Sequence, residues 1–371
     1  MAGRVVLHIG AMKTGTSYLQ SVLGSNTQAL EDAGFIFLGG KFGQQALAVR
    51  NVLNLPKAPR KNKVRWAALA EEAHKLDGRT GIVSMEFLSF AGPRHVRAFL
   101  EPLEGLEVEV VVTVRDQFRV IPAQWQTYTR NYGTDDWETY LRRIEPSKVA
   151  RQKSRAHKTF HRAQDVLPAL ERWRATGQVD LTHVMTVPGP GAPREELWHR
   201  FRAAAGIPEV DVDVEGVRDN ASLGFGSCDF LRRVNAHLQD VPARHYRKGM
   251  RAAVASALVN RRSSESRPEL DLRAAKFARS RNQDLRSGIV DSGYRLCGSL
   301  DDLPVPDDLG IYPKSAQAVP HDEVDGAARA VWSDLAAQLG EVDRTAPAAL
   351  DAVVEDTAEM LRTVNRWGGT P

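Results

Sequence analysis

Arg4-Val-Val-Leu-His-Ile-Gly-Ala-Met-Lys-Thr-Gly-Thr-Ser-Tyr-Leu-Gln20 combines three local signals in one short segment. Its apolar run at residues 5–9 predicts a buried strand. A loop punctuated by two glycines follows. The apolar spacing of Tyr18, Leu19 and Val22 then predicts a helix. The segment therefore indicates a strand, a loop and a helix in immediate succession.

The loop of this unit has the composition of an anion site. Unpaired backbone N–H groups at a helix N-terminus point outward, and the helix dipole adds partial positive charge there. Lys13 supplies a full charge, and Thr14, Thr16 and Ser17 supply hydroxyl donors around Gly15. We expect these five residues to bind a phosphate group. The alternative is a Gly/Thr-rich turn without a ligand.

The order of residues in the loop argues against an ATPase or GTPase. The Walker A pattern places a lysine directly after its second glycine. Gly10 and Gly15 have the separation of that pattern, but Thr16 follows Gly15. The lysine of this loop, Lys13, comes two positions before the second glycine instead.

Composition indicates a soluble globular protein of ordinary type. The chain has 371 residues, 42% of them hydrophobic and 26% charged, and its net charge is only +4. This length allows one large α/β domain with additions or two modest domains, and the small net charge does not favour a general nucleic-acid binder. Cys228 and Cys297 allow at most one disulfide and no zinc site.

The segment at the start of the chain lacks the features of a signal peptide, and no apolar run reaches the length of a membrane span. Together with the sparse cysteines, this favours a reducing, cytoplasmic location.

Apolar runs alternate with helical patterns along the first half of the chain. Strands followed by helices predict a mainly parallel sheet covered on both faces, a three-layer α/β fold. The nearly all β-branched run at 108–114 is typical of a central strand buried on both sides. The further expected strands are 34–38, 81–85 and 181–187, and the expected helices are 66–76, 121–131, 160–176 and 195–205.

The second half of the chain is less regular. Residues 244–286 are basic, with a helical pattern in the middle followed by a loop rich in Ser, Arg and Pro. Three interpretations of this segment stay open: it covers a bound nucleotide, it recruits an acidic acceptor, or it is a solvated face. From residue 311 the apolar spacing predicts terminal helices. We therefore expect a main domain at 1–310 and a helical extension at 311–371.

Two further residues are predicted to join the loop at one edge of the sheet. Ligands of parallel sheets gather at the carboxyl ends of the strands. Arg115 ends the central strand, and its guanidinium fork can bind a phosphate. Glu86 directly follows the expected strand at 81–85. By contrast, His8 and His183 lie inside strands and are expected to be core residues with satisfied hydrogen bonds.

The order Lys-Thr-Gly-Thr-Ser after a strand resembles the 5′-phosphosulfate loop of sulfotransferases that use 3′-phosphoadenosine 5′-phosphosulfate (PAPS). The resemblance spans roughly residues 4–305. It implies transfer of a sulfuryl group to a hydroxyl, or to an amine, with release of 3′-phosphoadenosine 5′-phosphate (PAP). In this interpretation Lys13 stabilises the leaving phosphate, Arg115 binds the 3′-phosphate, and Glu86 is the general base. Otherwise Glu86 caps the next element or pairs with Lys13.

The chain departs from the family pattern at one position. The serine that the family uses for the 3′-phosphate would fall at or beside Ala123, which has no hydroxyl. Gln124, Gln126 or Thr127 would have to replace it, or the 3′-phosphate is held elsewhere.

Two short motifs farther along the chain also resemble the family. Asn220 and Ser222 belong to an N-x-S-L segment, where they either contact the nucleotide or order a turn and cap a helix. Arg247 and Lys248 resemble a triplet that contacts the 3′-phosphate, but an Arg-rich region explains them equally well.

Two other functions remain open. One is a P-loop kinase with an unusual loop, and the other is a non-catalytic nucleotide-binding protein derived from a sulfotransferase. Neither a metal site nor a Mg²⁺ requirement is predicted. The expected acceptor is a small molecule, a glycan or a lipid head group, and the sequence does not distinguish among these.

Overall fold

The computed structural model describes residues 3–55, 65–145, 153–214, 222–242, 246 and 257–367. Six strands form one sheet in the order β2-β3-β1-β4-β5-β6, and every neighbouring pair is parallel. The strands are β1 (Arg4–His8), β2 (Phe35–Phe37), β3 (Thr80–Ser84), β4 (Glu107–Val114), β5 (Leu181–Thr186) and β6 (Arg295–Cys297).

The first strand lies between β3 and β4, at the centre of the sheet. His8, its last residue, pairs in register with Ser84 of β3 and with Val111 of β4. The β-branched run of β4 sends Val110 and Val112 to one face and Val111 to the other. Because both faces are buried, the strand needs an apolar residue at nearly every position.

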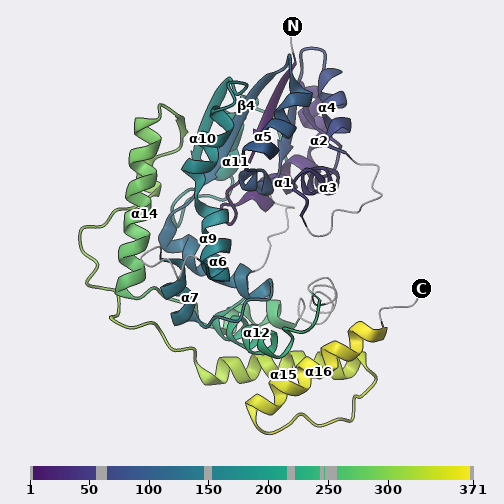
Figure 1. Cartoon of the computed structure of the whole chain (residues 1–371), viewed down its shortest axis with the longest axis vertical. Coiled ribbons are helices and arrows are strands. Elements are labelled where there is room, and N and C mark those ends of the chain that lie inside the picture. The colour runs from purple at the N-terminus through teal and green to yellow at the C-terminus, as the bar shows by residue number, and fades with distance from the viewer. Residues whose placement is uncertain are drawn as a thin grey trace. The chain divides into compact units, whose positions relative to one another are not determined.

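Helices cover both faces of the sheet (Figure 1). On one face the core joins the strands to α1 (Thr16–Ser25), α2 (Thr27–Asp32) and α11 (Glu196–Ala205). On the other face it joins them to α3 (Phe42–Val52), α4 (Trp66–His74), α5 (Pro93–Leu100), α10 (Val166–Arg174) and the end of α14 (Leu272–Asp291). The predicted three-layer α/β fold is confirmed.

Three local predictions were wrong or incomplete. The helix expected at 160–176 is two helices, α9 (Arg155–Gln164) and α10, separated at Asp165. The 20-residue helix α14 lies largely where the sequence suggested a basic loop. Its Ala274, Ala275 and Ala278 are buried, and its arginines are half-buried. The short strand β6 was not predicted, since its three residues are largely exposed and show no apolar pattern.

The chain divides into two compact units. The first consists of Met1–Val120, His161–Asn220 and Ala278–Pro306 and holds the sheet. The second consists of Ile121–Phe160, Ala221–Phe277 and Asp307–Pro371. The helix α6 (Gln117–Arg130) begins in the first unit and continues into the second. The boundary that the sequence suggested near residue 310 stays a prediction.

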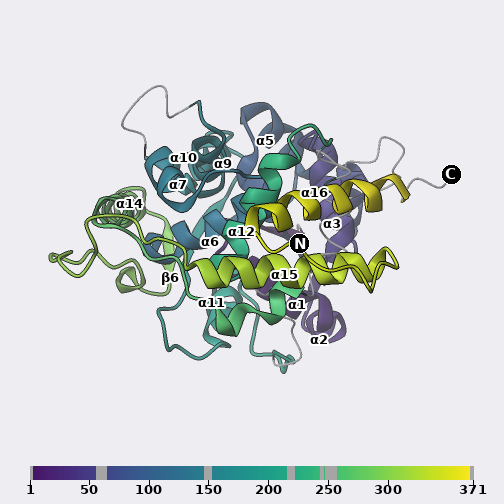
Figure 2. The same ribbon diagram turned by 90° about the horizontal axis from the view of Figure 1, so that it is seen from below.

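The second unit is helical. It contains α7 (Trp137–Ile144), α12 (Phe225–His237), α15 (His321–Gln338) and α16 (Leu350–Trp367). The last two confirm the predicted terminal helices, and both pack against α12 (Figure 2). The ring of Trp125 on α6 contacts Trp137 and Phe225, which makes an aromatic core for this unit. No helix among the described residues is long and apolar enough to cross a membrane.

Candidate functional site

The loop after β1 stays close to the neighbouring strands before it reaches α1. Ile9 donates a main-chain hydrogen bond to Val111, and Ala11 donates one to Thr113, each at 2.9 Å. A Cβ placed on Gly10 would lie 3.1 Å from the main chain of Glu86. The absence of a side chain at Gly10 therefore allows the loop after β1 to pack directly against the segment after β3.

The loop then turns into α1 at Gly15. Gly15 has a φ of 84° and is the N-cap of the helix. The left-handed backbone favours glycine here, and a Cβ at this position would also displace Cδ2 of Leu197, the end of a flexible side chain. Thr16 and Ser17 form the first turn of α1, where backbone N–H groups and the dipole favour an anion.

Lys13 and Thr14 are neighbours in the loop but differ in exposure. Lys13 is half-buried and has a φ of 65°, a left-handed conformation that shapes the loop at this residue. Thr14 is fully buried, and its hydroxyl donates to the main-chain oxygen of Ala11 at 2.6 Å. Thr14 thus closes the loop internally, and its hydroxyl proton is used within the loop.

Glu86 lies where the sequence predicted, directly after β3, at the start of the 3-10 helix η1 (Glu86–Phe90). Its carboxylate Oε2 accepts a hydrogen bond of 3.0 Å from Nε2 of Gln20, which also donates to the main-chain oxygen of Ser84. Gln20 is buried on α1, one turn after Thr16. The amide therefore fixes one carboxylate oxygen of Glu86 beside the first helix.

Arg115 ends the central strand and reaches across to the loop. Its Nη1 donates to the main-chain oxygen of Lys13 at 3.0 Å. Its Nε is buried and has no hydrogen-bond partner in the part of the chain that is described. Burial, assisted by the charge of Arg119 and opposed by that of Asp116, lowers the pKa of Arg115 to about 10. A half-buried guanidinium whose buried Nε donor is unused is suited to an anionic ligand.

A buried polar network fixes the turn that carries Arg115. Oδ1 of Asn282 accepts from the main-chain N–H of Gln117, and its Nδ2 donates to Asp116. Asp116 in turn accepts from the N–H of Phe118 and so begins α6. Burial raises the pKa of Asp116, although these hydrogen bonds oppose the shift. The contacts of Asn282 thus hold the end of β4 against α14.

A second set of contacts supports the loop itself. Nε2 of Gln164 donates to the main-chain oxygen of Met12 at 2.8 Å. Arg281 donates to the main-chain oxygen of Gln164 and to the side chain of Gln117. The loop and the Arg115 turn are thus joined through Gln164 at the end of α9 and Arg281 of α14.

His8 is the core histidine that the sequence predicted. It is fully buried, and its two ring nitrogens lie 2.8 Å from the hydroxyl of Ser84 and 2.7 Å from that of Thr113. Burial lowers its pKa to about 3, so the ring is neutral at physiological pH. It joins β3, β1 and β4 immediately beneath the loop.

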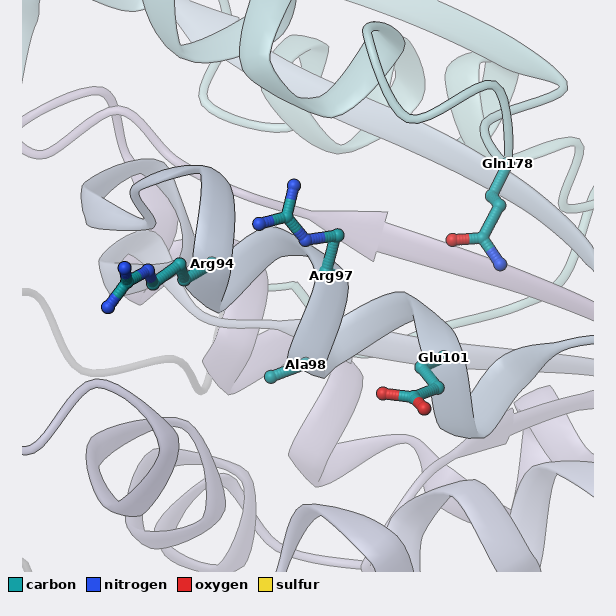
Figure 3. Close-up of a pocket in the computed structure, with 5 residues that line it drawn as sticks. All are labelled: Arg94, Arg97, Ala98, Glu101 and Gln178. Atoms are coloured by element: carbon teal, nitrogen blue, oxygen red, sulfur yellow. The ribbon is translucent and has the colours of Figure 1, made fainter.

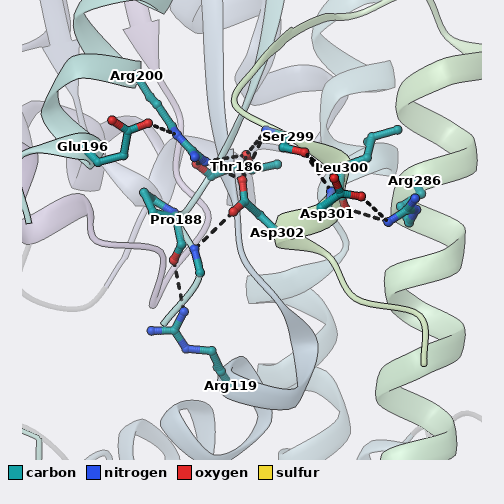
Figure 4. A network of polar contacts seen from close by, with 11 residues as sticks. Arg119, Thr186, Pro188, Glu196, Arg200, Arg286, Ser299, Leu300, Asp301 and Asp302 are labelled. Atoms are coloured by element: carbon teal, nitrogen blue, oxygen red, sulfur yellow. Dashed lines mark hydrogen bonds and ion pairs between the residues drawn. The ribbon is translucent and has the colours of Figure 1, made fainter. Parts of the chain in front are cut away.

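The loops after β5 and β6 are tied together by one carboxylate (Figure 4). Asp302 accepts hydrogen bonds from the hydroxyl of Thr186, from the main-chain N–H of Gly189 and from Arg200. Arg119, near the start of α6, donates to the main-chain oxygen of Pro188 at 3.1 Å. This arrangement holds the Pro/Gly-rich segment after β5 close to the helix that follows Arg115.

A separate surface pocket lies away from these residues. It has a volume of about 440 Å³ and is lined by Arg94, Arg97, Ala98, Glu101 and Gln178 (Figure 3). Glu101 precedes β4 and Gln178 precedes β5, so the pocket is near the amino ends of the strands. Ligands of parallel sheets bind at the other edge, and we do not assign this pocket to the site.

The structure brings together the predicted residues of the first unit: Lys13 to Ser17, Glu86 and Arg115 follow three adjacent strands. Gln124 and Ser222 lie in the second unit, and their predicted roles stay predictions. Gln124 is buried, and its Nε2 has no hydrogen-bond partner among the described residues. Asn220, Arg247 and Lys248 lie outside the residues that the structure describes.

Sequence reasoning missed the residues that support the site. Gln20, Gln164 and Asn282 are buried amides on helices, and each binds a group next to a predicted site residue. A buried amide within an apolar helical face is the only signal that could have identified Gln20. The partners of all three amides are distant in sequence, so the sequence gives no indication of the groups that they bind.

Within the described ranges, no three His, Cys, Asp or Glu side chains group as ligands for a metal ion. That catalysis needs no metal stays a prediction. Comparisons with protein-family models, with curated proteins and with solved structures find no match to this chain.

Proposed function

We propose that the protein is a PAPS-dependent sulfotransferase. The observation that carries the proposal is the side chain of Arg115, half-buried, bound to the Lys13 carbonyl and left with a buried Nε donor that no described residue uses. Together with the phosphate-type loop, it provides two cationic groups for a ligand with two separated phosphates. The resemblance of the loop to the 5′-phosphosulfate loop supplies the identity of that ligand.

Lys13, Thr16 and Ser17 would hold the 5′ end of the nucleotide. Transfer breaks the bond between sulfur and the bridging oxygen, and the electron pair of that bond remains on the phosphate. The ammonium group of Lys13 would stabilise this developing charge more in the transition state than in the ground state. Arg115 would bind the 3′-phosphate, which stays on the product PAP.

Glu86 would accept the proton of the acceptor hydroxyl while its oxygen forms a bond to sulfur. A general base must lie within hydrogen-bond reach of the proton it removes. Glu86 follows β3, the strand beside β1, and packs against Gly10 of the loop. Gln20 holds one of its carboxylate oxygens and leaves the other to the acceptor. The acceptor itself is a small molecule, a glycan or a lipid head group.

Release of PAP from PAPS in the presence of an acceptor panel tests this proposal. The wild type should form PAP, and Glu86→Gln should bind PAP as the wild type does but form it from PAPS far more slowly. A loss of about 10²–10⁴-fold is typical of a missing general base. Glu101→Gln, which changes a carboxylate near the opposite edge of the sheet, is the matched control.

If Glu86→Gln turns over PAPS as fast as the wild type, Glu86 is not the base. If the wild type binds PAP but gives no turnover with any acceptor, the non-catalytic alternative is favoured. Binding of Mg-ATP in preference to PAP would favour a kinase-like phosphotransferase instead.

A further inference from the structure

Three neighbouring strands place a thiol, an imidazole and a carboxylate in line. Sγ of Cys297 on β6 lies 4.0 Å from Nδ1 of His183 on β5. The other ring nitrogen of His183, Nε2, lies 3.3 Å from Oε2 of Glu109 on β4. In the strand register His183 lies opposite Val111 and Arg295, and Glu109 and Cys297 are each two positions from these partners. Residues two apart in a strand share a face, so the three side chains lie on one face of the sheet. This cluster is separate from the loop, Glu86 and Arg115.

The charges around His183 favour its protonated form. Burial alone would lower its pKa, but the contacts with Cys297 and Glu109 raise it to about 9. Glu109 is buried, and Nη1 of Arg4 lies 3.1 Å from its Oε1. His183 and Arg4 lower the pKa of Glu109 although burial opposes them, so the carboxylate stays charged.

We propose that Cys297 is a nucleophilic thiol, activated by His183 and Glu109, that forms mixed disulfides with small-molecule disulfides. An imidazolium next to a thiol favours the thiolate, which is the reactive form. The ion pair with Glu109 favours the charged imidazole, although Nε2 makes no hydrogen bond among the described residues, and this electrostatic support is the role of the third member in a nucleophile–base–acid arrangement. Cys297 is partly exposed, so a small reagent can reach it.

The reaction is a thiol–disulfide exchange. The Cys297 thiolate attacks one sulfur of the reagent, a new S–S bond forms to the protein, and the S–S bond of the reagent breaks. The second half of the reagent leaves as a thiolate and takes a proton from water. No other oxidant is consumed.

The chain contains its own reference thiol. Cys228 is fully buried on α12 and serves as the internal control. The proposal therefore predicts modification at one cysteine of the two. A reagent that reached the thiols only through unfolding would modify both.

The test is the rate of modification by glutathione disulfide, followed by intact mass and peptide mapping between pH 5 and 10. The wild type should gain one glutathione at Cys297, and at pH 6 it should react faster than a variant that lacks the imidazole. Cys228→Ser should behave like the wild type, and Cys297→Ser should not react.

His183→Gln should slow the reaction at pH 6 about tenfold and leave the rate at pH 9.5 nearly unchanged, because a thiol of higher pKa is more nucleophilic once ionised. Glutathione on both cysteines would overturn the proposal. So would a folded His183→Gln with the wild-type pH profile. If His183→Gln does not fold, Glu109→Gln provides the same comparison, and a wild-type pH profile in that variant would overturn the proposal.

Discussion

Nη1 of Arg115 donates a hydrogen bond to the main-chain oxygen of Lys13 at 3.0 Å. The residue proposed for the 3′-phosphate is thus joined to the loop proposed for the 5′-phosphate. Because one hydrogen bond of the guanidinium is used to order the loop, the remaining donors are presented in a fixed orientation. The two halves of the proposed nucleotide site are therefore one structural element.

Arg115→Met should weaken PAP binding strongly. Hydrogen bonds to charged groups contribute about 1.5–3 kcal/mol, so we expect a loss of roughly ten- to a hundredfold in affinity. Titration calorimetry with PAP measures this loss.

The matched control is Arg97→Met, which removes the same charge from the surface pocket near the amino ends of the strands. It should bind PAP as the wild type does. Equal losses in the two variants would mean that Arg115 contributes only general positive charge, and the assignment to the 3′-phosphate would fail.

Gly15→Ala should destabilise the loop through two effects. The left-handed backbone costs a non-glycine residue about 1–2 kcal/mol, and the new methyl group would collide with the side chain of Leu197. Gly177→Ala is the control for the first effect alone, because Gly177 has a φ of 72° but a methyl group there would meet no described atom within 4 Å. Denaturant unfolding should show a larger loss for Gly15→Ala by about 1–3 kcal/mol. Equal losses would show that the contact with Leu197 relaxes freely.

His8 should make the fold sensitive to acid. The folded protein keeps His8 neutral down to a pH of about 3, whereas the unfolded chain protonates it below its ordinary pKa of 6.5. The unfolded state therefore binds more protons in this window, and stability falls as the pH is lowered from 6.5 towards 3. The free energy of unfolding should fall by about 1.4 kcal/mol for each pH unit in this range.

His8→Asn should remove this part of the slope when the free energy of unfolding is measured from pH 7 to pH 4. Any difference in stability at neutral pH cancels, because the comparison uses only the change with pH. Substitution of the exposed His199 by Asn is the parallel control. An unchanged slope in His8→Asn would show that the buried ring is not the proton-binding group.

The sequence predicted the parts of this structure that depend on local pattern. The strand at 5–9, the β-branched run of β4 and the helix after Gly15 are each defined by consecutive residues, and the carboxyl-edge rule then placed Glu86 and Arg115 beside the loop. The supporting amides could not be predicted in this way. Asn282 binds Gln117 across 165 positions, a pairing that exists only after the chain has folded.

The same reason explains the errors in the second half of the chain. Helix α14 is rich in arginine, and several of its charges find partners only in tertiary contacts, such as Arg281 with Gln164. The composition of this segment, taken alone, therefore predicts a basic loop. Strand β6 is added to the sheet edge by pairing with β5, not by an apolar pattern of its own.

Calorimetric titration of the whole chain with PAP in the absence of Mg²⁺ is the decisive experiment for the proposed nucleotide site. A separate titration with Mg-ATP tests the alternative ligand, and Lys13→Ala is the variant. We predict saturable, one-site binding of PAP by the wild type, at least about tenfold weaker binding by Lys13→Ala, and no comparable binding of Mg-ATP. Absence of any heat or thermal stabilisation with PAP, or tight binding of Mg-ATP alone, would contradict the assignment.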